Sequence, residues 1–112
     1  MNCDTTYEAW SVVAVPLGAS GCGELHPAVV VSTREFNQNG TTILAPMTSA
    51  RRPGAEGDIR VEAGTAGLSK DSVIRMKLFT IESGSIGKKL GELPEAVGMA
   101  LGNQIFSLLR LG

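Results

Sequence analysis

Cysteine, histidine and aromatic residues are scarce in this sequence, and each scarcity excludes a class of chemistry or of fold. The 112 residues include two cysteines and one histidine, and they form neither a CxxC pair nor an HExxH motif. We therefore expect no zinc site, and no other metal or cofactor is predicted. Cys3 and Cys22 are too few for a disulfide framework and are expected to be reduced thiols, although a bridge between them stays open. With three phenylalanines, one tryptophan and one tyrosine, the core must be built mostly from valine, isoleucine and leucine.

Long hydrophobic runs are also missing. No apolar stretch approaches the roughly 20 residues that a membrane-spanning helix needs. The first residues lack the basic start and the apolar stretch of a signal peptide. We therefore expect a protein that stays in the cytoplasm and does not enter a membrane. Its length of 112 residues predicts a single domain over residues 1–112.

A surplus of positive charge is absent, since the formal net charge is −1. Dedicated duplex-binding proteins usually carry a clear basic surplus. Positive charge is instead local, and it suits a short single-stranded segment better than a long duplex. The local cations that we consider are Arg51, Arg52, Arg75, Lys77, Lys88 and Lys89.

What the sequence does contain is a series of short β-type runs. Runs rich in valine, isoleucine and threonine, bounded by glycine, proline or asparagine, predict strands over residues 8–15, 28–32, 41–45, 58–61, 72–81 and 88–93. Residues 18–24 and 49–57 are expected to be exposed loops, and residues 64–70 are turn-like. Residues 28–32 are continuously apolar, which predicts burial on both faces of a sheet.

The apolar period changes at Pro94, which suits a first helical position. An apolar stripe at helical spacing then follows, formed by Val97, Leu101, Ile105 and Leu108. Gly98 and Gly102 each cost about 1 kcal/mol of helix propensity relative to alanine. They provide either a flat surface for close packing or are simply tolerated. Five or six short strands and one C-terminal helix predict a mainly β (α+β) fold, a small curled antiparallel sheet capped by that helix.

Two of these runs end in side chains that can react. One begins with His26, and the other ends in Thr48 and Ser49. If the two strands pair side by side, the imidazole and both hydroxyls lie near one rim of the sheet. This rim is the candidate functional site.

The same segments carry a resemblance to a known family. Pro27-Ala28-Val29-Val30-Val31-Ser32, Pro46-Met47-Thr48-Ser49, Leu78-Phe79-Thr80-Ile81-Glu82 and the later Gly-Lys-Lys-Leu-Gly-Glu-Leu stretch resemble, in order and spacing, the MazF/PemK toxin endoribonucleases of toxin–antitoxin pairs. The resemblance implies a half-open SH3-like, CcdB-like barrel and a homodimer. It also implies metal-independent cleavage of single-stranded RNA at short preferred sequences, and neutralisation by a cognate antitoxin.

The resemblance assigns catalytic positions, with two departures. Thr48 matches the threonine that supports the phosphate, and Ser49 matches the serine beside it. The family arginine before the first-motif proline is His26 here. Imidazole titrates near pH 6.5 and can shuttle protons, so His26 either replaces that arginine or is a solvated strand-end residue at a lost site. A carboxylate that many relatives carry on the fifth strand is replaced by Met76.

The resemblance and the local charges also suggest positions that bind RNA. Arg75 and Lys77 flank the expected site and could bind phosphate. Arg51 and Arg52 could hold RNA at the margin of the groove. The alternative for all four is a solvated cation at a strand edge or in a loop.

Two functions of different kinds follow. The first is a dimeric endoribonuclease toxin that works through His26, Thr48, Ser49 and Arg75. The second is a catalytically silent or contact-acting relative that binds a protein target, as CcdB toxins do, or binds only its antitoxin. An unrelated barrel acting as an adaptor is a third possibility, because a fold does not prove a function.

Overall fold

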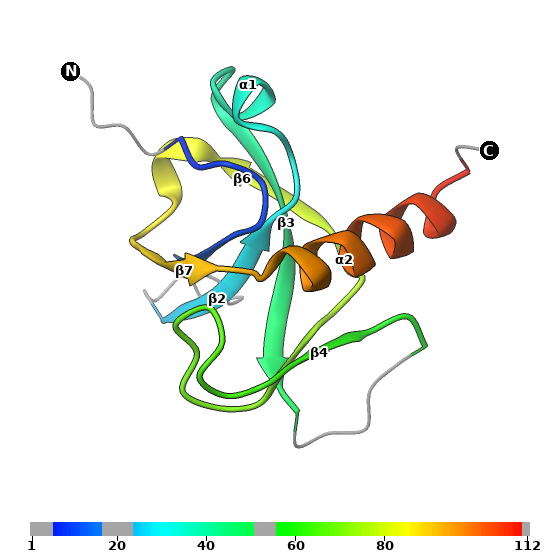
Figure 1. The fold of residues 1–112 in the computed structure, drawn as a ribbon. Coiled ribbons are helices and arrows are strands. Elements are labelled where there is room, and N and C mark those ends of the chain that lie inside the picture. Colours follow the sequence, from blue (N-terminus) through cyan, green and yellow to red (C-terminus); the bar gives the residue numbers. More distant parts are fainter. Residues whose placement is uncertain (1–5, 17–23, 51–55, 111–112) are drawn as a thin grey trace.

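The computed structural model describes residues 6–16, 24–50 and 56–110. These residues form a curled antiparallel sheet of seven strands and a C-terminal helix, which confirms the predicted mainly β half-barrel (Figure 1). The elements are β1 Ser11–Pro16, β2 Leu25–Val30, α1 Arg34–Asn37, β3 Thr41–Ser49, β4 Ile59–Val61, β5 Ser72–Ile74, β6 Phe79–Glu82, the 3-10 turn η1 Ser83–Ser85, β7 Lys89–Glu92 and α2 Glu95–Leu108. Cys3, Cys22, Arg51, Arg52 and most of the loop predicted over residues 18–24 lie outside the described residues.

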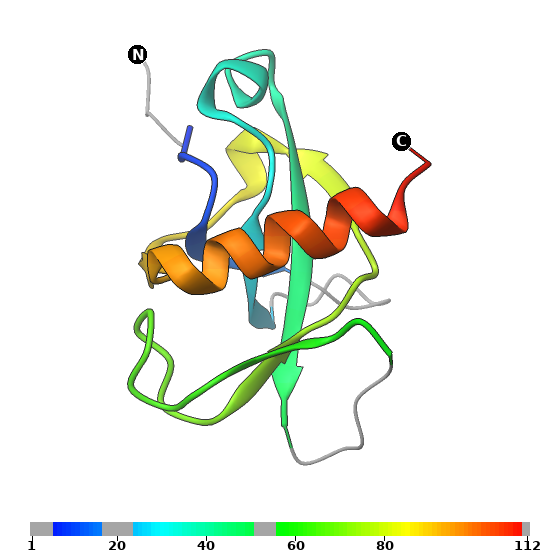
Figure 2. The same cartoon turned by 45° about the vertical axis from the view of Figure 1, so that its right-hand side comes forward.

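The long strand β3 organises the sheet. The strand order is β4-β5-β3-β2-β1-β7, and β6 pairs with the first half of β3. On one side β3 pairs with β2; on the other it pairs with β6 over residues 41–44 and with β5 over residues 47–49. Strand β3 therefore exchanges one neighbour for another at its middle. The two views show it running through the body of the molecule behind α2 (Figures 1 and 2).

Pro46 marks this exchange, and two strand predictions are wrong around it. The third strand does not stop at Pro46 but continues to Ser49, and the strand predicted over residues 72–81 is in fact two strands, β5 and β6. A proline has no amide hydrogen to donate to a neighbouring strand. It is tolerated here because it lies between the two pairings. The Arg75 amide, just after β5, donates to the Pro46 carbonyl at 2.8 Å.

The sheet is buried on both faces. Val12 of β1 and Val29 of β2 lie in a cluster that includes Leu101 of α2. Val13 and Val30 lie in a second cluster on the opposite face. Alternate residues of a strand point to opposite faces, so these two strands contribute to both clusters. The predicted two-sided burial of the second strand is confirmed.

Asn37, in the polar segment between β2 and β3, anchors their connection although it is fully buried. Its side-chain amide donates to the Tyr7 carbonyl at 2.8 Å, and the Ser83 hydroxyl donates to its backbone carbonyl at 2.9 Å. A buried polar group is costly unless it is hydrogen-bonded. These bonds tie the β2–β3 connection to the N-terminal segment and to η1.

Two glycines allow the turn after β4, the strand at one end of the order, to contact β7, the strand at the other end. A Cβ on Gly67, in the turn after β4, would lie 2.1 Å from the Leu90 carbonyl oxygen of β7. A Cβ on Gly91 would lie 2.5 Å from the carbonyl carbon of Ala66. Real Cβ atoms do not approach backbone atoms so closely, so both positions require glycine. The turn therefore packs directly against β7 and curls the sheet.

Helix α2 is held against the sheet by Trp10. This residue has a positive φ of 74°, so the first strand begins at Ser11 and not at residue 8 as predicted. A Cβ on Gly98 would lie 2.8 Å from Cδ1 of the Trp10 ring, whereas a Cβ on Gly102 would lie 3.5 Å from Cζ2. The close-packing interpretation therefore holds for Gly98. Gly102 has room for a methyl group.

The apolar stripe of α2 is only partly buried. Leu101 is fully buried, but Leu108 is 50% exposed. The two residues share a face, and the last turn of the helix extends beyond the body of the sheet (Figure 2). The predicted stripe is therefore buried at Leu101 and half exposed at Leu108. Pro94 is the N-cap rather than the first helical residue. No helix in the described part of the chain is long and apolar enough to cross a membrane.

We predict opposite effects of alanine at the two helix glycines. Gly98→Ala should lower the free energy of unfolding by about 1–2 kcal/mol, because the clash with Trp10 outweighs the gain in helix propensity. Gly102→Ala, the matched control, should raise it by up to about 1 kcal/mol. Urea denaturation of both variants measures the difference. Stabilisation by both alanines would contradict the close packing of Trp10 on α2.

Candidate functional site

Strand pairing brings the three predicted catalytic residues to one rim. Ala28 of β2 pairs with Pro46 of β3 in antiparallel register. The β2–β3 pairing ends at this pair, so His26 lies two residues before it on β2 and Thr48 two residues after it on β3, at the same rim. The prediction that His26, Thr48 and Ser49 lie near one another rested on this pairing.

These three residues line one hollow, which we call the first hollow. It has a volume of about 360 Å³, within the range of roughly 300–1,000 Å³ typical of small-molecule sites. Its lining residues are His26, Pro27, Met47, Thr48, Ser49, Leu68, Ser69, Lys70 and Ser72. Hydroxyl groups, one imidazole and one ammonium therefore surround a partly apolar floor. Such a set can donate hydrogen bonds to an anionic group and can carry a proton.

The functional side chains of the first hollow are accessible from solvent. Thr48 is exposed, and Ser49 and His26 are half-buried. Nε2 of His26 lies 3.8 Å from a carboxylate oxygen of Glu24, and the two side chains are 42% and 82% exposed. At such exposure an ion pair holds the imidazole only weakly. His26 is thus free to meet a ligand that enters the hollow.

Lys70 and Ser72 are part of the hollow, and sequence reasoning missed both. Ser72 pairs with Ser49 where β5 joins β3, and this pairing places Lys70 beside the rim. The Ser72 hydroxyl donates to the Lys70 carbonyl at 3.1 Å, which fixes the turn before β5. The turn-like composition of residues 64–70 indicated a loop. No local signal in it showed which strand the following segment would join.

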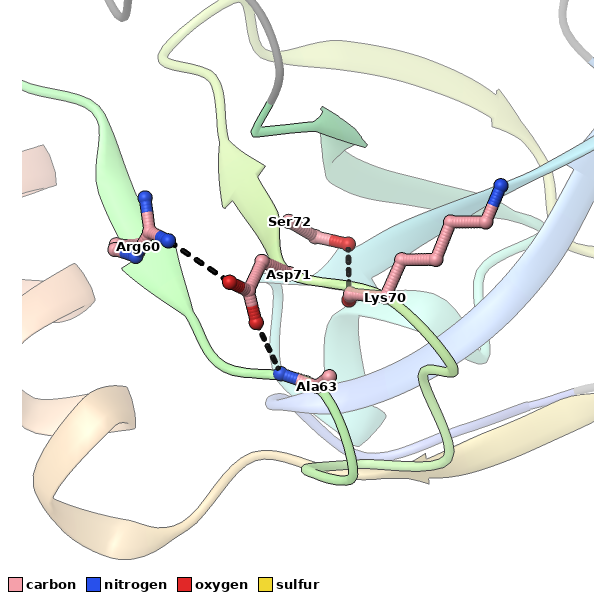
Figure 3. Close-up of polar contacts among 5 residues, drawn as sticks. All are labelled: Arg60, Ala63, Lys70, Asp71 and Ser72. Carbon is pink, nitrogen blue, oxygen red and sulfur yellow. Dashed lines mark hydrogen bonds and ion pairs between the residues drawn. The ribbon is translucent and has the colours of Figure 1, made fainter.

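A second hollow of about 410 Å³ adjoins the first. It is lined by Ser49, Ala50, Arg60, Ala63, Lys70 and Asp71. One oxygen of Asp71 accepts from the Arg60 guanidinium at 2.9 Å, and the other accepts from the Ala63 amide at 2.8 Å. Figure 3 shows the Asp71 carboxylate between these two donors, with the Lys70 side chain extending away from them. Arg60 is thereby held in place.

Arg75 and Lys77, the two predicted RNA-binding residues that the structure describes, line neither hollow. Nε of Arg75 lies 3.1 Å from a carboxylate oxygen of Asp58. Asp58 is only 6% exposed, so this carboxylate offsets the arginine charge in a partly buried position. Lys77 is exposed, and Met76 packs against the α2-side core cluster. Arg51 and Arg52 lie outside the described residues.

No metal-ligand cluster occurs among the described residues, in the sense of three or more His, Cys, Asp or Glu side chains grouped together. On β7, Lys89 donates to Glu92 at 2.6 Å. This hydrogen bond, together with the lysine charge, lowers the pKa of Glu92 below its usual value. The pair lines neither hollow. It is therefore a feature of the sheet surface.

The chain resembles toxins of known structure along nearly its whole length. MazE–MazF (Form-II) from Deinococcus radiodurans has a TM-score of 0.78 and 24% identity, covering 96% of this chain and 98% of that one. An endoribonuclease in complex with its cognate antitoxin, from a mycobacterial species, has a TM-score of 0.76 and 18% identity, with 95% and 97% covered. The Mycobacterium tuberculosis toxin MazF-mt6 has a TM-score of 0.72 and 20% identity, with 87% and 93% covered. Identities this low show a shared fold.

No curated protein sequence matches the chain. The family model that describes the PemK-like, MazF-like toxin of type II toxin–antitoxin systems matches residues 8–109. This match spans all seven strands and α2. The chain therefore belongs to the PemK-like, MazF-like toxin family of type II toxin–antitoxin systems.

Proposed function

We propose that this chain is a toxin endoribonuclease that cleaves single-stranded RNA in the first hollow without a metal ion. The observation that carries the proposal is the meeting of His26, Thr48 and Ser49 along one hollow. Membership of the toxin family supports the biological role. The description of one structural neighbour as an endoribonuclease supports the type of reaction.

The proposed reaction uses the nucleophile that RNA itself carries. The ribose 2′-oxygen attacks the adjacent phosphorus while the bond from phosphorus to the 5′-oxygen breaks. The products are a 2′,3′-cyclic phosphate and a 5′-hydroxyl end. A base must remove the 2′-proton, donors must stabilise the charge on the phosphoryl oxygens, and an acid must protonate the leaving oxygen. None of these tasks requires a metal ion.

The residues of the first hollow match these tasks. His26 moves the proton from the 2′-oxygen to the leaving 5′-oxygen, because imidazole can both accept and donate one. The hydroxyls of Thr48 and Ser49 donate to the phosphoryl oxygens. Arg75 and Lys77, with Arg51 and Arg52 beyond the described residues, are proposed to contact RNA outside the hollow. These roles rest on the family resemblance and on local charge.

The proposed partners follow from the family. Two of the similar structures are a MazE–MazF complex and an endoribonuclease with its cognate antitoxin. We propose that this chain likewise binds a cognate antitoxin, and that it acts on RNA in the cytoplasm. A homodimer is also proposed, because α2 leaves an apolar patch exposed. The patch consists of Met99 and Phe106, which are seven residues apart and share one face of the helix.

One observation favours the second candidate function, a silent or contact-acting relative. Apart from Lys70, His26 is the one titratable side chain among the described residues that line the first hollow. If Lys70 binds phosphate, base and acid are therefore not provided by two separate groups. A toxin that acts by binding a protein target would need neither. Growth arrest on expression, without new RNA ends, would support this function.

We predict sequence-specific cleavage by the wild-type protein in EDTA. Primer extension on a long, weakly structured RNA should reveal new 5′ ends, and these ends should accept phosphate from a kinase without prior phosphatase treatment. Thr48→Ala should slow cleavage by about 10²–10³-fold, as expected for loss of one donor to the reacting phosphate. His26→Ala should slow it by about 10²–10⁴-fold.

Thr80→Ala is the matched control for Thr48→Ala, because Thr80 is also an exposed strand threonine but lines neither hollow. It should cleave at the wild-type rate. Cleavage lost with Thr48→Ala but retained with His26→Ala would keep the enzyme and remove His26 from the mechanism. RNA left intact by folded wild-type protein would contradict the proposed reaction.

We further predict that the α2 patch supports dimerisation. Phe106→Ser should shift the protein from dimer to monomer, because it removes the largest apolar side chain of the patch. Phe36→Ser alters an exposed phenylalanine of α1 and should leave the dimer intact. Light scattering at micromolar concentration measures the mass of each variant. A monomeric wild-type protein would refute the dimer.

A further inference from the structure

The two hollows share a wall. Ser49 and Lys70 line both of them. The pairing of Ser49 with Ser72 fixes this wall, since it joins the end of β3 to the start of β5. A chain-like ligand seated in the first hollow can therefore continue into the second by passing these two residues. RNA is a ligand of that shape.

The charges of the second hollow divide into a compensated and an uncompensated cation. The Arg60 guanidinium lies 2.9 Å from the Asp71 carboxylate, so its charge is offset. Among the described residues, no carboxylate lies within ion-pair distance of the Lys70 ammonium. Figure 3 shows the Lys70 side chain pointing away from Asp71. Lys70 is thus the cation of the shared wall that attracts an anion.

Arg60 has the properties of a stacking surface. Asp71 holds its guanidinium from one side, and Asp71 is itself held by the Ala63 amide. The Arg60 side chain nevertheless remains 60% exposed. A planar guanidinium can stack on a nucleobase of any identity. Ala50 and Ala63 beside it are small and leave room for a flat ring.

We propose that the second hollow binds the nucleotide next to the two that the scissile phosphate joins, and that Lys70 binds the phosphodiester linking it to them. The base of that neighbour stacks on Arg60. This inference rests on the proposed function, because it takes the first hollow as the site of cleavage. It adds a substrate requirement: the RNA must extend at least one nucleotide, on the side of the second hollow, beyond the two nucleotides that the scissile phosphate joins.

Binding to an uncleavable probe tests the inference separately from catalysis. The probe is a labelled ten-nucleotide RNA pool of mixed sequence with 2′-O-methyl groups throughout, which block the nucleophile. Lys70→Gln should reduce the slope of log affinity against log salt by about 0.7, the value for one phosphate contact on a single strand. Lys88→Gln removes an exposed lysine that lines neither hollow and should leave the slope unchanged.

Arg60→Lys distinguishes stacking from charge. The substitution retains the positive charge but removes the planar guanidinium group on which the base stacks. Affinity for the probe should therefore fall about tenfold, while the slope of log affinity against log salt stays the same. In cleavage assays, Lys70→Gln should raise KM about tenfold and leave kcat within about twofold, because the contact is made equally before and during the reaction. Lys70→Arg should restore KM.

The outcomes separate this inference from the proposed function. Wild-type cleavage with an unchanged slope and KM in Lys70→Gln overturns the inference alone, and it would assign the second hollow to a different ligand, such as a protein partner. A fall in kcat with unchanged KM also overturns it, because Lys70 would then act at the scissile phosphate. A wild-type protein that neither cleaves RNA nor binds the probe overturns both.

Discussion

The exchange of partners along β3 is the constraint on which the site depends. Pro46 cannot donate a hydrogen bond, so the side of β3 facing β6 and β5 is divided there into two pairings. The first pairing holds β3 in the body of the sheet. The second brings Ser72, and with it Lys70, against the end of β3. Without this division the hydroxyls of Thr48 and Ser49 would end a strand with no cation beside them.

Close backbone packing keeps the sheet curled around that arrangement. Gly67 and Gly91 allow the turn after β4 to touch β7, and Gly98 allows α2 to approach Trp10. Gly67 directly precedes Leu68, which lines the first hollow. The contact of its turn with β7 therefore helps to position Leu68 and Lys70. The scaffold and the site are therefore coupled through residues 63–72.

Much of the fold could be predicted from local pattern, and the site only in part. Period-two alternation and a change of period at Pro94 are local signals, so most strands and α2 were found. The meeting of His26 with Thr48 could be predicted because it needs only that two strands adjacent in the chain pair. The position of Lys70 could not be predicted, because it depends on the pairing of β5 with β3. Nothing local in the sequence showed that β5 pairs with β3 and is separate from β6. The exposure of Leu108 could not be predicted, because periodicity shows which face of a helix is apolar but not where the sheet beneath it ends.

The central claim is that RNA binds where β3 ends, and backbone amide shifts in the NMR spectrum test it most directly. The uncleavable 2′-O-methyl RNA pool would be added to isotopically labelled protein in EDTA. The account predicts the largest shifts at His26, Thr48, Ser49 and Lys70, the residues that line the first hollow. Shifts confined to the α2 patch, with none at the first hollow, would contradict it and would favour a contact-acting protein.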